Sequence, residues 1–340
     1  MRINNDTINF LTDTIDEIVT HYYNYQNNLN VENISETVEN KIHVTYLEAL
    51  RDVLEMYMDD CEIEVDDKNQ QIVNELFEQL DEWFANHTVN SEEIRRALLL
   101  LNIKGFKQSN YSLDIITPDA VGMVLVHLVN AYFNEGEKIS ILDPNCGTGN
   151  LMSLLNNYLP NEVEFVGIDN HQILTTLCSA EANFLEMQAQ IYYQDALQDC
   201  FNNHDILVTD VASYDYDLKN YKSELGDKGI KYFPYLLIEK YLSSKNSINK
   251  QIYLIDNDFF EQEGSEIFKD YLQDKAIIKS LIALPKSMFL KEDYTRGILI
   301  LESKDEVNKN QKTGVYILPS LSETEKLNKV LNEIKKDLKN

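Results

Sequence analysis

One stretch of the chain, residues 139–169, constrains the fold more than any other, because it runs through strand, glycine-turn, helix and strand patterns in turn. The pattern predicts two apolar strands joined by a turn and a short helix, at Ile139–Leu142, Gly147–Gly149, Leu151–Tyr158 and Val163–Ile168. A carboxylate follows each strand directly, Asp143 after the first and Asp169 after the second. This order is typical of a nucleotide-binding unit in a parallel sheet.

The residue types in this stretch discriminate between ligands that contain adenosine. Gly147 and Gly149 let the backbone approach a ligand closely, and the helix that follows offers unpaired N–H groups in its first turn. A dinucleotide site has a third glycine, but Met152 stands at that position. Asp143 can hold an ammonium group, and Asp169 stands where an acid binds the hydroxyls of a ribose. An adenosyl ligand with an amino-acid tail is therefore favoured over NAD, and a purely structural glycine turn is the alternative.

The sequence DPNCGTGN at residues 143–150 resembles motif I of class I S-adenosylmethionine (SAM) methyltransferases, in particular the N6-adenine DNA methylases related to type I modification subunits. The segment LIALPKSMF at Leu281–Phe289 is similar to a stretch that follows the sixth strand in that family. The resemblance covers roughly residues 100–305. It implies an α/β fold with a doubly wound, mostly parallel seven-stranded sheet of the Rossmann-like class I SAM-methyltransferase type, preceded by an all-helical N-terminal domain.

The resemblance also implies which residues bind SAM. Thr117 stands in a segment similar to a family element that contacts the methionine end of the cofactor, although Thr117 also fits as the cap of the next helix. Asp195 follows the strand Ala189–Tyr193, where the family's acid faces the adenine amino group, but such an acid can equally cap the next turn. The cofactor-binding residues that we predict are Thr117, Asp143, Asn145, Gly147, Gly149, Asp169, Asn170, Asp195 and Ala196.

The catalytic motif is expected after the fourth strand, Asp205–Thr209, where this chain departs from the family. The family carries (N/D/S)-P-P-(Y/F) there, and its first side chain and the following carbonyl accept the two hydrogens of an exocyclic amine. This chain keeps an acid, Asp210, and an aromatic residue, Tyr214, which we predict to be catalytic, but both prolines are absent. Arg296 and Lys286 are interpreted either as groups that face a substrate or as plain surface charges.

Three functions fit these observations. The first is a SAM-dependent methyltransferase that transfers a methyl group to an amine, as N6-adenine DNA methylases do. The loss of both prolines supports a second hypothesis, a SAM-binding regulatory protein or subunit that no longer methylates. A methyltransferase that acts on a small molecule or a protein is the third. The net charge of −27 argues against binding of duplex DNA, because phosphate contacts from basic residues supply most of the affinity of a protein for DNA. Nucleic acid is thus implied by the resemblance and disfavoured by the charge.

The remaining sequence indicates the organisation of the chain. Residues 1–110 are predicted to form the helical domain, residues 111–305 the SAM-methyltransferase core, and residues 306–340 an extension with a strand and a helix. Helical periodicity is found at Thr7–Tyr25, Ser35–Met58, Gln70–Ala85 and Ile94–Leu101, the last preceded by a capping box at Asn90–Glu93. The acidic segment Asp59–Asp67 is interpreted as a solvated loop, with a metal site as the alternative, and Leu218–Ile230 as a mobile loop over the site.

Composition sets the cellular expectations. The 340 residues are 44% hydrophobic, which is ordinary for a soluble globular protein, and no apolar run reaches the length of a membrane helix. Four cysteines without metal-binding spacing indicate reduced thiols in the cytoplasm, so we expect no membrane association and no metal. SAM is the one cofactor that we predict, and the helical N-terminal domain could pair two copies of the chain into a homodimer.

Overall fold

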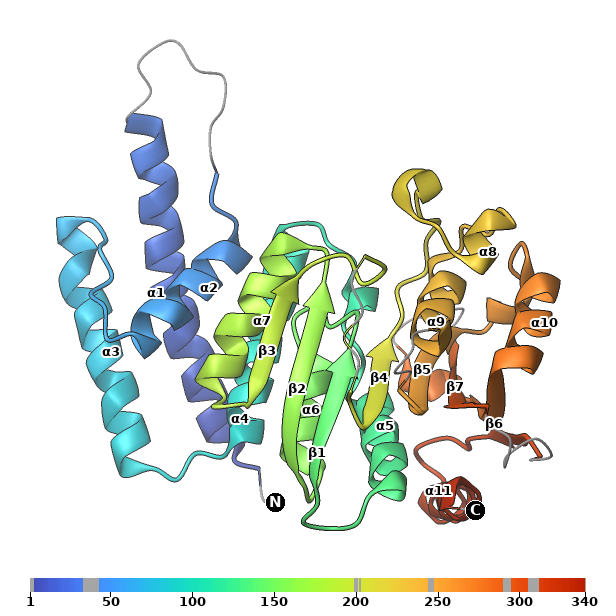
Figure 1. Ribbon diagram of the computed structural model, residues 1–340. Helices are drawn as coiled ribbons and strands as arrows, with labels where there is room; N and C mark the ends of the chain where they lie inside the picture. The colour runs from blue at the N-terminus through green and yellow to red at the C-terminus, as the bar shows by residue number, and fades with distance from the viewer. Residues whose placement is uncertain are drawn as a thin grey trace. The chain divides into compact units, whose positions relative to one another are not determined.

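A computed structural model describes residues 3–32, 43–198, 201, 203–243, 248–289, 295–304 and 312–339 of the chain (Figure 1). The chain divides into two compact units, and neither unit is continuous in sequence. The first unit consists of Met1–Ile116, Thr148–Ser153 and Gln172–Met187. The second unit consists of Thr117–Gly147, Leu154–His171 and Gln188–Asn340.

The first unit is helical, as its periodicity predicts. Its elements are α1 (Asn5–Glu32), α2 (Tyr46–Met58), α3 (Asp67–Asn86), α4 (Ser91–Gln108), the 3-10 turn η1 (Leu113–Ile115) and α7 (Gln172–Phe184). Their apolar faces share one core, whose fully buried members include Leu11, Ile18, Leu47, Leu50, Leu54, Phe106 and Leu177. Because α7 packs against α2, this helix of the methyltransferase segment belongs to the core of the helical unit. Sequence periodicity alone could not assign it there.

Side-chain caps fix where two of these helices begin. Asn90 and Glu93 form the predicted capping box before α4, since each side chain accepts the other residue's backbone N–H. Thr45 and Glu48 form a second capping box, and α2 therefore begins at Tyr46 instead of at residue 35. Residues 33–42, which the prediction also placed in this helix, lie outside the described residues.

The acidic segment between α2 and α3 is not simply a solvated loop. Ile63 and Val65 alternate with its acids and are buried in the helical core, at 2% and 6% exposure. Because these two apolar side chains pack into the core, the acidic side chains that alternate with them face outward. No group of three or more His, Cys, Asp or Glu side chains that could hold a metal occurs among the described residues.

The second unit is built on a single sheet that confirms the predicted α/β fold. Within the described residues the sheet has eight strands, in the order β3-β2-β1-β4-β5-β7-β6-β8. Their bounds are β1 Lys138–Asp143, β2 Glu162–Asp169, β3 Ala189–Tyr193, β4 Ile206–Asp210, β5 Lys250–Asp256, β6 Ala276–Ala283, β7 Arg296–Ser303 and β8 Gly314–Ile317. Pairing is parallel except along β7, which is antiparallel to β5 and β6. The predicted count of seven is exceeded because β8 pairs with β6 along the sheet edge.

Helices and turns complete the second unit. They are α5 (Asp119–Tyr132), α6 (Asn150–Tyr158, whose first residues belong to the first unit), η2 (Leu218–Asn220), α8 (Glu224–Asp227), α9 (Phe233–Ser243), η3 (Phe259–Glu261), α10 (Ser265–Lys275), η4 (Lys286–Met288) and α11 (Thr324–Lys339). A buried aromatic cluster on α9, η3 and α10 includes Tyr235 stacked on Phe268, with ring centroids 3.9 Å apart. α5 packs against α11.

One stretch of the described residues, Leu113–Tyr132, is long and apolar enough to cross a membrane by length and composition alone. The prediction that no apolar run has this length was therefore wrong. In the fold, the stretch is divided between η1 and α5 by the segment that contains Pro118. Most of α5 is buried, from Val121 to Ala131. A core helix of a globular unit accounts for this hydropathy.

Residues 218–230, predicted to be a mobile loop, are anchored by a buried acid on α9. Glu239 accepts hydrogen bonds from the Ser223 hydroxyl at 2.6 Å and from the Leu225 N–H at 2.9 Å. Leu225 and Ile230 are buried in the core of the second unit. The segment was predicted to be mobile because its composition is polar, and these two buried apolar residues were not recognised as anchors.

Candidate functional site

Aspartates end four neighbouring strands of the second unit. Because β1, β2, β4 and β5 run in the same direction, their last residues lie along one edge of the sheet: Asp143, Asp169, Asp210 and Asp256. Asp195 follows β3 at the same edge. Ligands of open α/β sheets bind at this carboxyl edge, where the strand order reverses between β1 and β4.

Asp143 is buried at 2% exposure between β4 and the glycine turn. Its Oδ1 accepts hydrogen bonds from the Thr209 hydroxyl at 2.7 Å and from the Asn145 N–H at 3.1 Å. Burial raises the pKa of Asp143 to about 7, although the two hydrogen bonds oppose the rise and the nearby acids Asp210 and Asp169 add to it. A buried carboxyl group with this pKa gains greatly from a cationic ligand, because such a ligand favours its ionised form.

Asp169 holds the glycine turn in place. Its carboxylate accepts the Gly147 N–H at 3.0 Å, the Asn145 side-chain amide at 3.2 Å and the His171 N–H at 2.9 Å. The turn is further tied to the end of β2 by the Cys146 N–H, which donates to the Ile168 carbonyl at 3.0 Å. A carboxylate has about four acceptor sites, so much of the capacity of Asp169 serves the turn itself.

The two glycines of the turn have backbone conformations that favour glycine. Gly147 has a φ of +55° and Gly149 a φ of +80°. At Gly149 a Cβ atom would also come within 2.7 Å of the Cys178 sulfur in the first unit. Gly149 is therefore required by packing as well as by backbone conformation. This glycine has a structural role whether or not it also contacts a ligand.

Thr117 does not cap α5. The N-cap is Pro118, which has no side chain able to cap, and the Thr117 hydroxyl instead donates to Asp210 Oδ2 at 2.7 Å. A partner 93 positions away in the sequence thus overrides the local capping pattern. Thr117 and Asp210 are therefore in direct contact.

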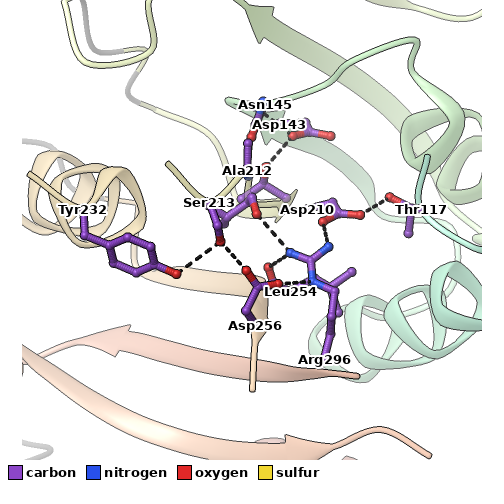
Figure 2. Close-up of polar contacts among 12 residues, drawn as sticks. Thr117, Asp143, Asn145, Asp210, Ala212, Ser213, Tyr232, Leu254, Asp256 and Arg296 are labelled. Carbon is purple, nitrogen blue, oxygen red and sulfur yellow. Dashed lines mark hydrogen bonds and ion pairs between the residues drawn. The ribbon is translucent and has the colours of Figure 1, made fainter. Parts of the chain in front are cut away.

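Arg296, the first residue of β7, is buried at 3% exposure, and is not a surface charge (Figure 2). Its Nη1 donates to Asp210 Oδ1, and its Nη2 donates to the carbonyls of Val211 and Leu254, both at 2.9 Å. Its Nε lies 3.2 Å from Asp256 Oδ1. The guanidinium therefore binds both oxygens that the family motif would offer to an amine, the first side chain and the next carbonyl. Lys286, in contrast, is exposed on η4.

The segment after β4 connects these groups to the glycine turn. The Ala212 N–H donates to Asn145 Oδ1 at 2.7 Å, and the Ser213 hydroxyl donates to Asp256 Oδ2 (Figure 2). Tyr214 stacks on Phe233 with ring centroids 4.6 Å apart and an interplanar angle of 15°. The Val211–Tyr214 segment thus has a defined conformation without the two family prolines.

Two further predicted residues lie beside Tyr214 and Tyr216. Tyr214 shares a side-chain hydrogen bond with Asn170, and burial raises the pKa of the Tyr214 phenol. Asp195 accepts the Tyr216 hydroxyl and also the Leu197 N–H at 2.9 Å, so it caps the next turn as the structural alternative proposed. Its neighbour Ala196 is buried at 5% exposure. Asp195 and Asn170 thus have structural partners in addition to any ligand.

The structure therefore brings most of the predicted second-unit residues into a connected network at the sheet edge. Three members were missed or misjudged from sequence: Thr209, Asp256 and the buried position of Arg296. Asp256 follows the same strand-end pattern as Asp143 and could have been found by extending that pattern to β5. Thr209 and Arg296 carry no local signal, because their roles depend on pairing with β1 and β5.

Comparisons with known proteins agree with this fold. A model of the N-6 DNA methylase family matches residues 103–339. The uncharacterized protein YtxK of Bacillus subtilis (strain 168) is 30% identical over 260 residues, which cover 74% of this chain and 78% of that protein.

Solved structures share the architecture. A Listeria monocytogenes protein described as a class I SAM-dependent methyltransferase has a TM-score of 0.79 at 22% identity, covering 98% of this chain and 99% of its own. A Vibrio vulnificus YJ016 protein described as the modification subunit of a type I restriction enzyme has a TM-score of 0.59 at 14% identity, covering 96% and 82%.

The fold and the glycine turn at the sheet edge therefore define a class I SAM-dependent methyltransferase. Within this class, the chain belongs to the N-6 DNA methylase family. This membership confirms the family resemblance and identifies SAM as the cofactor.

The residues present fit this cofactor. Asp143 offers a buried carboxyl group for an ammonium group, and the turn at Gly147 exposes no Cβ atom toward the edge. Asp169 and Asp195 add acceptors where the family places the ribose and the adenine. A cation with several hydroxyl and amine donors matches an edge that is dominated by carboxylates.

Proposed function

We propose that the chain transfers the methyl group of SAM to an amine that is held at Asp210 and at the carbonyl of Val211. One observation supports this proposal: both oxygens accept hydrogen bonds from the N–H groups of a single planar guanidinium, that of Arg296. Two acceptors that open toward one planar N–H donor are what an amine needs if its lone pair is to be directed away from them.

Each residue then has a role of its own. When bound, SAM supplies a methyl group on a positively charged sulfur. Asp143 would hold the ammonium of the amino-acid tail, and the turn from Asn145 to Gly147 would lie along it. Asp210 and the Val211 carbonyl would orient the amine, and the Asp210 carboxylate would take up the proton that the methylated amine releases. Tyr214, already stacked on Phe233, would bound the acceptor on its aromatic side.

The acceptor class follows from charge. Asp143, Asp169, Asp195, Asp210 and Asp256 all lie along the proposed binding edge, and the whole chain has a net charge of −27. Such an edge repels phosphates, whereas DNA methylation requires a close approach of the DNA backbone. We therefore propose an amine on a small molecule or a protein as the acceptor, and treat DNA as the outcome to exclude.

A second function is favoured by a specific observation. Arg296 is buried and fills both amine acceptors, and the family prolines beside them are absent. A SAM-binding protein that signals or assembles without transferring a methyl group fits this closed arrangement.

Labelled SAM separates the candidates. We would incubate the protein with methyl-tritiated SAM and, in parallel, with adenine-containing DNA, with cell-extract protein and with the metabolite fraction of the extract. Label on protein or metabolites supports the proposal, and label on DNA would overturn the acceptor class. Micromolar SAM binding by calorimetry without label on any fraction supports the second function. No binding of SAM or of S-adenosylhomocysteine would refute both.

A further inference from the structure

Arg296 is the buried charge at the sheet edge to which neither the family nor the proposed function gives a role. Its guanidinium contacts the Asp210 carboxylate, the carbonyls of Val211 and Leu254, and the Asp256 carboxylate. We propose that this guanidinium is an internal occupant of the acceptor-amine site, and that an acceptor amine enters only by displacing it. The inference rests on the proposed function, because that function assigns the Asp210 and Val211 oxygens to the acceptor.

The chemistry of the occupant matches that of the ligand it would replace. A guanidinium is planar and carries only N–H donors, and an amine conjugated to an aromatic ring or to a carbonyl likewise presents its N–H groups in one plane. The same carboxylate and carbonyl can therefore accept from either group. The positive charge of Arg296 additionally offsets the clustering of Asp210 and Asp256, with which it forms ion pairs.

The other hydrogen bonds of these groups show which acceptors would be vacated if Arg296 withdrew. Asp210 Oδ2 would keep the Thr117 hydroxyl at 2.7 Å. Asp256 would keep the Ser213 hydroxyl, and the Leu254 carbonyl would keep the Val211 N–H at 3.2 Å.

Asp256 Oδ1 would lose its ion pair with the Arg296 Nε. Among the described residues, the oxygens that would lose a hydrogen bond from Arg296 and keep no other donor are Asp210 Oδ1 and the Val211 carbonyl. These are the two acceptors of the proposed amine site. The guanidinium thus occupies the pair of oxygens that the proposed function assigns to the acceptor amine. The arrangement favours exchange between an internal and an external N–H donor.

The test measures recognition of an amine directly. The protein is saturated with S-adenosylhomocysteine so that the cofactor site is closed to nucleosides, and binding of adenosine is compared with binding of purine riboside, which lacks the 6-amino group. In the wild type both ligands should bind equally weakly, within about twofold. In Arg296→Ala, adenosine should bind at least about tenfold more tightly than purine riboside, because a hydrogen bond to a charged group is worth about that factor.

Competition with free guanidinium tests whether the guanidinium group and the amine bind at the same place. At roughly 20 mM, against equal NaCl, free guanidinium should weaken adenosine binding to Arg296→Ala and leave the wild type unchanged. If Arg296 only maintains the structure, guanidinium would strengthen binding to the variant instead, which overturns the proposal. A folded Arg296→Ala that does not discriminate between the two nucleosides overturns it as well.

Arg296→Lys is the second variant, in case the alanine variant does not fold. Lysine keeps the charge near Asp210 and Asp256 but lacks the planar fork, so the nucleoside preference should lie between those of the wild type and Arg296→Ala. A lysine variant identical to the wild type would contradict the proposal. If the wild type does not bind S-adenosylhomocysteine, the proposed function fails first. The occupancy is then judged by whether guanidinium raises the melting temperature of the Arg296 variants selectively.

Discussion

The guanidinium of Arg296 and the carboxylate of Asp210 form an ion pair at the sheet edge, with side-chain exposures of only 4% and 13%. Asp210 ends β4 and Arg296 begins β7, and the two meet because both strands flank β5. The pair therefore places a cation where the methylase family would present open acceptors. Stability and acceptor access depend on the same contact.

Removing Arg296 should destabilise the protein. In Arg296→Met, Asp210 and Asp256 lose their shared cation, and breaking a buried pair from one side costs about 3–5 kcal/mol. Asp256→Asn should cost less, about 1 kcal/mol, because that side chain is 20% exposed and keeps an oxygen for Ser213. Urea unfolding measures both. The double variant Asp210→Asn with Arg296→Met should regain part of the loss, and strict additivity of the two losses would speak against direct pairing.

Cofactor binding should depend on Asp169 and not on Asp210. Asp169→Ala removes the acceptor of three N–H groups, two of which belong to the glycine turn, so SAM affinity should fall at least about a hundredfold. Asp210→Asn changes the acceptor side only and should leave the affinity within about threefold. Calorimetry with S-adenosylhomocysteine provides the measurement, and a melting curve checks that each variant is folded. Equal losses in the two variants would show that cofactor and acceptor residues are not separable.

The affinity for SAM should rise with pH through the titration of Asp143. Burial raises the pKa of Asp143 to about 7, so at pH 6 most of this carboxyl is protonated and cannot pair with the ammonium group of the ligand. Between pH 6 and about 7.5 the affinity should increase roughly fivefold to tenfold as the competent fraction grows. Above that range the gain should end, because an α-amino group loses its own proton near pH 8.

Asp143→Asn is the decisive variant for this pH dependence. It should bind weakly at every pH and show no rise, whereas Asp205→Asn, at the exposed opposite end of β4, should retain the profile of the wild type. A rise of the same size in Asp143→Asn would assign the titration to another group.

The local parts of this architecture were predictable from sequence. The strands and the helix around the glycine turn were predicted to within about a residue at each end, as β1, α6 and β2 show, because alternation of apolar runs with glycine and acid is a local signal. The same signal places Asp143, Asp169 and Asp210 at strand ends, and parallel pairing then brings them to one edge. That these acids bind SAM and an amine stays a prediction.

The non-local parts could not be predicted. Thr117 has every sequence mark of a helix cap, but a hydrogen bond to Asp210 prevails over it. The sequence left Arg296 open between a group that faces a substrate and a surface charge, because only the antiparallel register with β5 reveals that it lies opposite Asp256. β8 joins the sheet through a partner more than thirty residues earlier in the chain, which no periodicity in its four residues indicates.

A buried acid of the first unit should make stability fall with rising pH. Glu181 on α7 is 5% exposed, and burial raises its pKa from 4.5 to about 8, although a hydrogen bond with Asn102 and the charge of Arg95 oppose the rise. Between about pH 4.5 and 8 the folded protein therefore holds a proton that the unfolded chain has released. The stabilising contribution is complete below about pH 4.5 and is lost as the pH approaches 8.

Glu181→Gln imitates the protonated carboxyl at every pH and should remove this dependence. Relative to the variant, the free energy of unfolding of the wild type should decrease by at most about 5 kcal/mol from pH 4.5 to 8, since one pKa unit corresponds to about 1.4 kcal/mol. Urea unfolding at several pH values measures the difference, with Glu78→Gln on exposed α3 surface as the matched control. Parallel stability curves for the wild type and Glu181→Gln would show that Glu181 keeps the same charge in the folded and unfolded chain.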